Sequence, residues 1–218
     1  MESLRRRIAQ EEFDYQTLVH ALRDYAHPRD KITDLLRKGV VIRVKKGLYV
    51  FGEQYRRRPI SREVLANLVY GPSYVSLDSA LQYHGLIPEA VEAVTSVTTL
   101  RPRRFHTPVG LFLYRPIPAR AFSIGVVRVE VNGGQSFLIA TPEKSLSDRV
   151  RDDRGTGLET QRQMREYLVN GLRIDEEALA ALDVELIGEI ARLQGSRKLL
   201  LLYRTLERMQ RSRVAVHA

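Results

Sequence analysis

The chain has 218 residues with ordinary hydrophobic and charged fractions, so it can form one large domain or two smaller ones, each with a core. It contains no cysteine, which excludes disulfides, thiolate metal sites and cysteine nucleophiles. No apolar run is long enough to span a bilayer and the charged N-terminal segment has no signal-peptide core, so we expect a cytoplasmic protein without a membrane partner.

The net charge of +9 is concentrated in one stretch of the chain. Residues 37–62 carry nine basic side chains against one acidic side chain, whereas the remaining residues almost balance. Polyphosphate backbones bind such patches because binding releases condensed counterions. The stretch therefore favours a nucleic-acid partner, with a solvated basic face as the alternative.

Residues 1–52 predict a winged helix-turn-helix, a helical unit that ends in a two-stranded hairpin. Leu4 and Ile8 share one face of a first helix, which we expect to end near Glu11. Asp14 is the expected N-cap of a second helix, whose apolar residues recur at helical spacing up to Leu22. A module of this kind usually binds duplex DNA, with its recognition helix in the major groove.

A third helix is expected from Pro28 to Lys38. Proline suits the first helical turn, and Gly39 supplies a left-handed stop. In this register the apolar side chains face the core. The residues left facing outward are Arg29, Lys31, Thr33, Asp34 and Arg37.

The N-terminal part of this third helix would reach base edges if it is a recognition helix. Arg29 and Lys31 are then expected to read guanine, and Thr33 to contact a phosphate or a thymine methyl group. Asp30 and Asp34 would repel phosphates, although a carboxylate can accept a hydrogen bond from cytosine. The target sequence therefore does not follow from the helix.

Residues 40–51 alternate as two strands of a hairpin, and Lys45-Lys46-Gly47 forms its turn. Basic side chains on such a wing bind the DNA backbone and position the protein without reading sequence. The residues expected to do so are Lys38, Arg43, Lys45 and Lys46. A winged helix can also bind a protein partner without DNA readout, and this alternative stays open.

Residues 53–62 predict a basic linker, because they contain few apolar side chains. Arg56, Arg57 and Arg58 are candidate phosphate contacts or, equally, a solvated charge run. Residues 63–155 predict an α+β domain, with Ser61 as the N-cap of its first helix and a second helix from Leu77 to His84.

Two hairpins and a further helix complete this predicted domain. The hairpins surround Pro108-Val109-Gly110 and Asn132-Gly133-Gly134, and the helix starts at Thr141-Pro142-Glu143. Residues 156–218 predict a helical C-terminal extension with segments at 158–169, 175–182, 184–193 and 196–213. The fold class is α+β: an N-terminal winged helix-turn-helix, a mixed α+β domain and a helical tail.

Four carboxylates in one segment suggest a metal-dependent nuclease as a third reading of the chain. They are Glu143, Asp148, Asp152 and Asp153. Carboxylates of this kind can hold Mg²⁺, but an ordinary exposed helix with pairing to Lys144, Arg149 and Arg151 explains them as well. No histidine pair or phosphate loop supports catalysis, so we assign no catalytic residue, metal or cofactor.

Two further segments carry basic side chains. The first is a small cluster of Arg101, Arg103, Arg104 and His106 beside Phe105. It could bind a single strand by stacking, or protect an exposed strand edge. The second is the last helix, whose apolar stripe and arginines fit packing on its own domain, a dimer interface or a membrane surface.

Four segments of the chain together resemble the AbiEi family of antitoxins and transcriptional regulators. They are Lys45-Lys46-Gly47-Leu48-Tyr49, Tyr74-Val75-Ser76-Leu77-Asp78-Ser79-Ala80-Leu81, Gly85-Leu86-Ile87-Pro88 and Ala140-Thr141-Pro142-Glu143-Lys144-Ser145-Leu146-Ser147-Asp148. Their order and spacing cover residues 28–150, and the helical tail after Gly155 falls outside the resemblance.

The resemblance implies a non-enzymatic repressor that binds inverted repeats in its own promoter through an N-terminal winged helix. It also implies that residues 63–155 form an antitoxin-like domain that counters a nucleotidyltransferase toxin in a type IV toxin-antitoxin or phage-defence operon. In that family the antitoxin need not bind its toxin directly. Because inverted repeats need two modules at a fixed spacing, we expect a homodimer, at least on DNA.

Overall fold

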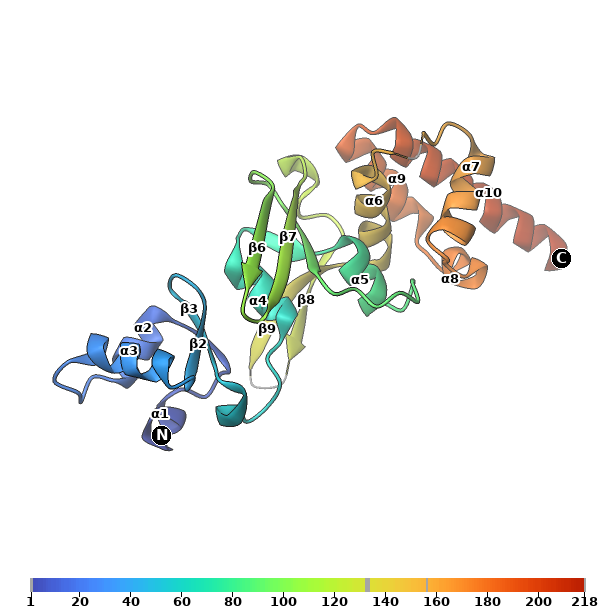
Figure 1. Cartoon of the computed structure of the whole chain (residues 1–218). Coiled ribbons are helices and arrows are strands. Elements are labelled where there is room, and N and C mark those ends of the chain that lie inside the picture. Colours follow the sequence, from blue (N-terminus) through green and yellow to red (C-terminus); the bar gives the residue numbers. More distant parts are fainter. Residues whose placement is uncertain (1, 132–133, 156, 218) are drawn as a thin grey trace.

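The computed structural model describes residues 2–131, 134–155 and 157–217, which form a mixed α+β fold with two sheets and a helical C-terminus (Figure 1). The N-terminal unit contains α1 (Glu2–Arg7), β1 (Glu12–Asp14), α2 (Tyr15–Ala21), α3 (Pro28–Arg37), β2 (Val41–Lys45) and β3 (Leu48–Phe51). Its three strands are antiparallel in the order β1-β3-β2. The expected α+β class is therefore confirmed.

Local signals explain most of these N-terminal elements. Asp14 caps α2, since its carboxylate accepts a hydrogen bond from the Thr17 amide at 2.7 Å. Gly39 ends α3 with a φ of 64°, and Gly47 closes the β2–β3 turn with a φ of 87°. The prediction that the first helix reaches Glu11 is wrong, because that helix ends at Arg7 and β1 follows it.

The segment predicted as a linker runs along the N-terminal unit and is fixed to it. It contains a short 3₁₀ helix, η1 (Glu53–Tyr55). Glu11 accepts a hydrogen bond from the Arg57 amide at 3.2 Å, and Glu12 accepts one from the Ser61 amide at 2.6 Å. Both glutamates are buried, so the segment's backbone satisfies carboxylates that would otherwise be costly to bury.

The central part of the chain is a six-stranded mixed sheet with flanking helices. Its elements are α4 (Arg62–Val69), β4 (Ser73–Val75), α5 (Leu77–Tyr83), β5 (Val94–Thr98), β6 (Arg103–Thr107), β7 (Gly110–Pro116), η2 (Ala119–Ala121), β8 (Val126–Val131), β9 (Gln135–Ala140) and α6 (Pro142–Asp152). The strand order is β6-β7-β5-β4-β9-β8, so that β6 and β8 are the two edges. The pairs β4–β9 and β5–β7 are parallel, and the other neighbours are antiparallel.

Both predicted hairpins of this part are confirmed as the strand pairs β6–β7 and β8–β9. Of the second turn, Asn132 and Gly133 lie outside the described residues. The predicted helix starts are confirmed as well: the Ser61 hydroxyl accepts from the Val64 amide at 3.2 Å, and the Thr141 hydroxyl accepts from the Lys144 amide at 3.3 Å.

The C-terminal part is a helical layer on the far side of the six-stranded sheet from the N-terminal unit (Figure 1). It comprises α7 (Gln161–Glu166), a π-helical turn η3 (Tyr167–Gly171), α8 (Glu176–Ala180), α9 (Val184–Gln194) and α10 (Arg197–His217). Leu199, Leu202 and Leu206 of α10 are fully buried against this layer, so the apolar stripe of the last helix packs on its own domain. In the described part of the chain, no helix is long and apolar enough to cross a membrane.

The N-terminal unit and the central part share an apolar core at their boundary. Phe13, Leu18 and Phe51 belong to a core inside the N-terminal unit. Val44 and Leu48, from the other face of the β2–β3 hairpin, belong instead to the core beneath the six-stranded sheet. The hairpin is therefore packed on both faces, and this fixes the N-terminal unit against the central sheet.

Candidate nucleic-acid interface

Helix α3 presents its basic face outward because its apolar face is buried. Ile32 and Leu35 are 5% and 4% exposed and belong to the N-terminal core. Arg29, Thr33 and Arg37 are exposed on the other side of the helix. The structure thus places the expected contact residues of this helix on an accessible surface, beside the exposed side chains of the hairpin.

Asp34 occupies the centre of this surface and binds three of its cations. Its carboxylate lies 2.8 Å from the Arg37 guanidinium, 2.9 Å from the Lys38 ammonium and 3.5 Å from the Lys31 ammonium. Hydrogen bonds from Lys38 and then Arg37 lower the pKa of Asp34 to about 2, so that the group is ionised at neutral pH. These three basic residues therefore present less positive charge than their number suggests.

Arg29 is the basic residue of α3 that this carboxylate does not engage. Its guanidinium is exposed and has no hydrogen-bond or ion-pair partner among the described residues. The Thr33 hydroxyl donates to the Arg29 carbonyl at 3.2 Å, which leaves the hydroxyl oxygen able to accept. Arg29 lies in the first turn of α3, the position from which a recognition helix reaches base edges.

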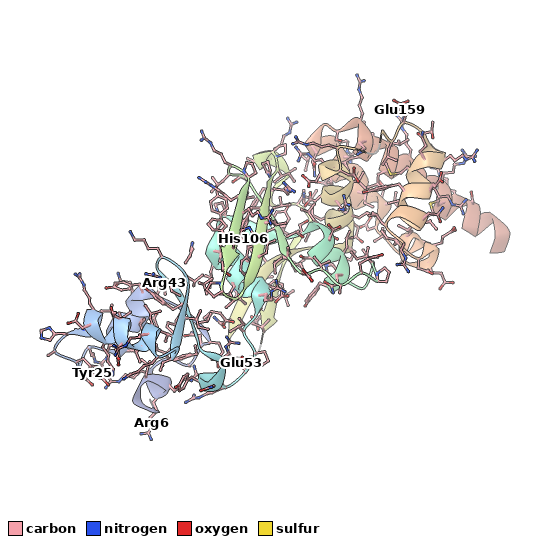
Figure 2. All side chains as sticks on the ribbon, viewed as in Figure 1. Arg6, Tyr25, Arg43, Glu53, His106 and Glu159 are labelled. Carbon is pink, nitrogen blue, oxygen red and sulfur yellow. The ribbon has the colours of Figure 1, made fainter. Side chains whose placement is uncertain are left out.

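The hairpin presents Arg43 and Lys46 to the exterior, and the side chains of both are without a partner within the described ranges (Figure 2 labels Arg43). Lys45, the third basic residue of the hairpin, is partly buried. Its ammonium donates to the carbonyl of Val69 at the end of α4, and burial lowers its pKa. A bulge between Arg43 and Lys45 shifts the strand register, so that Lys45 points back toward the central part.

Of the three arginines after the hairpin, two bind backbone carbonyls and one is exposed. Arg56 donates from Nε to the Phe51 carbonyl at 2.8 Å, and Arg58 donates to the Ala9 carbonyl at 3.2 Å. Both guanidinium groups therefore support the N-terminal fold. The side chain of Arg57 is exposed and, in the part of the chain that the structure describes, unpaired, so it is the member of the triplet free to meet a phosphate.

Asp148 was expected on an exposed helix, but the structure buries it together with Lys144. Its carboxylate accepts hydrogen bonds from the Lys144 ammonium, the Tyr74 hydroxyl and the Ser76 hydroxyl, each at 2.9 Å, and from the Gln194 amide at 3.3 Å. Burial lowers the pKa of Lys144, partly offset by the charge of Asp148, and raises the pKa of Tyr74. Periodicity alone gives no signal for this network, because its members come from β4, the N-cap of α5, α6 and α9.

The other carboxylates of the nuclease alternative each contact a different partner. Asp152 is 3.3 Å from the Arg115 guanidinium, and Asp153 accepts from the Tyr167 hydroxyl at 2.9 Å. Glu143 accepts from the Asp183 amide at 3.2 Å. Among the described residues, no group of three or more histidine, aspartate or glutamate side chains is placed to hold a metal ion.

Comparison with known proteins adds no family to these observations. No model of a known protein family matches the chain, and no curated protein matches it. The argument for function therefore depends on the surface formed by α3 and the β2–β3 hairpin.

Proposed function

We propose that this protein is a sequence-specific transcriptional repressor that binds duplex DNA through α3 and the β2–β3 hairpin. The observation that carries the proposal is a set of exposed cations on these two elements whose side chains have no partner among the described residues: Arg29, Arg43 and Lys46. Arg29 would read base edges, and the other two would bind phosphates on either side of the groove.

The order of the N-terminal elements supports a winged helix-turn-helix. Helices α2 and α3 follow each other across the short segment between Ala21 and Pro28, and the hairpin follows α3 directly. Strand β1 pairs with β3, so that the hairpin is part of a three-stranded sheet behind the helices. A recognition helix followed by a basic wing is an arrangement that suits the major groove and the adjacent backbone.

The first experiment is equilibrium binding of the full chain to the DNA upstream of its own gene across a salt series, with a scrambled duplex beside it. We expect preference for the upstream duplex and a steep loss of affinity with salt, because each phosphate contact releases counterions. Equal, weak binding to both duplexes would contradict the proposal and favour a winged helix that binds a protein.

Two sets of substitutions separate backbone contacts from base contacts. Arg43→Gln with Lys46→Gln should weaken binding to every sequence and lower the salt slope by about 2, roughly 0.9 per lost phosphate contact. Arg29→Ala should instead reduce the preference for the upstream duplex. Arg128→Gln is the matched control, since Arg128 is exposed on β8, the edge of the six-stranded sheet opposite β6.

The second part of the proposal, an antitoxin acting against a nucleotidyltransferase toxin, rests on the resemblance to the AbiEi family. Three of the four resembling segments meet in the central part: Tyr74 and Ser76 bind Asp148, and the Leu86 amide donates to the Leu81 carbonyl at 2.8 Å. These contacts give a structural reason for the residues that the segments have in common with the AbiEi family, and this supports a fold shared with that family.

Co-expression with a nucleotidyltransferase encoded beside this gene tests the antitoxin role. Restored growth is expected with the full chain and also with Arg43→Gln, Lys46→Gln, because DNA binding and toxin neutralisation use different parts of the proposed molecule. Continued growth arrest with the wild-type chain would remove the antitoxin role and leave the DNA-binding proposal standing.

A further inference from the structure

The edge strand β6 carries a second basic surface, outside the N-terminal unit. Arg101, Arg103, Arg104 and His106 are all exposed, and the segment 101–107 contains no carboxylate. Arg104 donates from Nε to His106 Nε2 at 2.8 Å, which orders these two side chains along the strand. Arg101 and Arg103 have side chains without a partner among the described residues.

A chain of contacts places this surface beside the hairpin. Lys45 of the hairpin donates to the carbonyl of Val69, and the next residue, Tyr70, donates through its hydroxyl to the carbonyl of Arg101 at 3.2 Å. The Tyr70 ring also lies 5.8 Å from the Phe105 ring on β6. Figure 2 labels Arg43 on the hairpin and His106 on β6, at the flank of the six-stranded sheet nearer the N-terminal unit.

The relative position of the two surfaces is held by a common core. Val44 and Leu48 of the hairpin and Tyr114 of β7 belong to one buried cluster, and Phe105 of β6 packs against it. Such packing leaves little freedom for one surface to move against the other. The hairpin that carries Arg43 and Lys46 and the β6 edge that carries Arg101 and Arg103 are therefore held at a fixed separation.

We propose that the β6 edge is a second contact surface for the same DNA duplex, with Arg101 and Arg103 binding phosphates beyond the segment that α3 reads. Arginine suits this role because its planar fork binds phosphate oxygens in pairs. The surface fits a duplex better than a single strand, since Phe105 is half-buried between Tyr70 and Tyr114 and cannot stack on a base. This inference rests on the proposed function and adds a second part of the chain to its interface.

The test compares three forms of the full chain on a long upstream duplex and on a single-stranded probe across a salt series: wild type, Arg101→Gln with Arg103→Gln, and the control Arg128→Gln at the opposite sheet edge. We expect the double variant to lower the salt slope by about 2, with the preference over a scrambled duplex unchanged. Its melting temperature should equal that of the wild type, because both side chains are exposed and contact no partner in the part of the chain that the structure describes.

The outcomes distinguish the inference from the proposed function. If the wild type prefers the upstream duplex and the double variant has the wild-type slope, the β6 edge does not contact DNA and the inference is overturned, while the winged-helix proposal stands. If the double variant loses binding only to a single-stranded probe, the duplex assignment is overturned. If the wild type shows no preference for the upstream duplex, the proposed function fails and the inference fails with it.

Discussion

Asp148 and Lys144 form a buried ion pair whose surroundings satisfy both charges. The lysine is fully buried and the aspartate is 4% exposed, and two hydroxyl groups and an amide complete the coordination of the carboxylate. Removal of one partner leaves an uncompensated charge in the interior, which costs far more than the net value of the pair.

Asp148→Leu should therefore lower the free energy of unfolding by about 3–5 kcal/mol, as expected when one member of a buried pair is lost. The double variant Lys144→Met, Asp148→Leu should recover part of this loss, because no charge is then left buried. Asp152→Asn is the control on the same helix and should stay within about 0.5 kcal/mol of wild type, since Asp152 is half-buried and pairs at the surface. Urea denaturation measures all three, and a double variant no more stable than Asp148→Leu would contradict the pairing.

A second single residue, Asp34, leads to a prediction about DNA binding. Asp34→Asn should raise affinity for any duplex by at least about threefold at roughly 0.1 M salt, because it removes a negative charge and releases Lys31, Arg37 and Lys38 toward phosphates. Asp30→Asn, which removes an equal charge from the same helix without releasing a partner, should give a smaller gain. Equal gains would show that the three cations do not face the DNA.

The pH dependence of this effect follows from the low pKa of Asp34. A carboxylate whose folded pKa is about 2, below its ordinary value of 3.8, keeps its charge and its stabilising ion pairs above that ordinary value. These ion pairs are lost only as the pH falls through about 2. The affinity ratio of Asp34→Asn to wild type should hence be constant between about pH 5 and pH 8 in a binding titration, whereas a ratio that falls toward pH 5 would mean a higher pKa.

At the scale of elements, the β2–β3 turn depends on the conformation of Gly47. Its φ of 87° is in the left-handed region, and its carbonyl accepts from the Tyr15 amide at 3.0 Å. Gly47→Ala should lower the free energy of unfolding by about 1–2 kcal/mol, the cost of a Cβ in that region. Gly155→Ala is the matched control, because an added Cβ there meets no atom within 4 Å and its φ is not positive. Thermal unfolding should give a lower melting temperature for Gly47→Ala than for Gly155→Ala. Equal melting temperatures would contradict the turn conformation assigned to Gly47.

The elements that the sequence did not predict are short and held by distant partners. β1 and β4 have three residues each, which is too few for an alternating pattern to be detected. β1 exists because it pairs with β3, and β4 because it lies between β5 and β9. The longer helices and both hairpins of the central part carried caps, glycine turns or periodicity of their own, and these were predicted in the right places.

Within the candidate interface, the residue types were predictable but their pairing was not. The outward face of α3 follows from helical spacing, so Arg29, Thr33 and Arg37 lie where the sequence placed them. The inward turn of Lys45 depends on a bulge and on the carbonyl of Val69, which is far away along the chain. The proximity of β6 to the hairpin depends in the same way on contacts between distant segments.

At the scale of the whole molecule, the shared core predicts a single unfolding unit for the N-terminal and central parts. Leu48 is 4% exposed and packs in the core beneath the six-stranded sheet. Leu48→Ala should lower the free energy of unfolding by about 2–5 kcal/mol. Hydrogen exchange should show α2 and β5 losing protection together.

The control for this prediction is Leu200→Ala, because Leu200 is 37% exposed on α10. Its effect should stay within about 0.5 kcal/mol. Loss of protection in α2 alone in the Leu48→Ala variant would show that the N-terminal unit unfolds independently.

The double-sided packing of the β2–β3 hairpin also limits how the N-terminal unit could be transferred to another protein. Its outer face carries Ile42, Val44, Leu48 and Val50, which the central sheet covers here. Fusion of residues 1–61 to an unrelated protein would expose these apolar side chains, and an exposed patch of this kind favours aggregation. These four residues alternate along the strands with residues that face the N-terminal core. Polar residues at the four positions would therefore be the minimum change for an N-terminal unit that folds outside this protein.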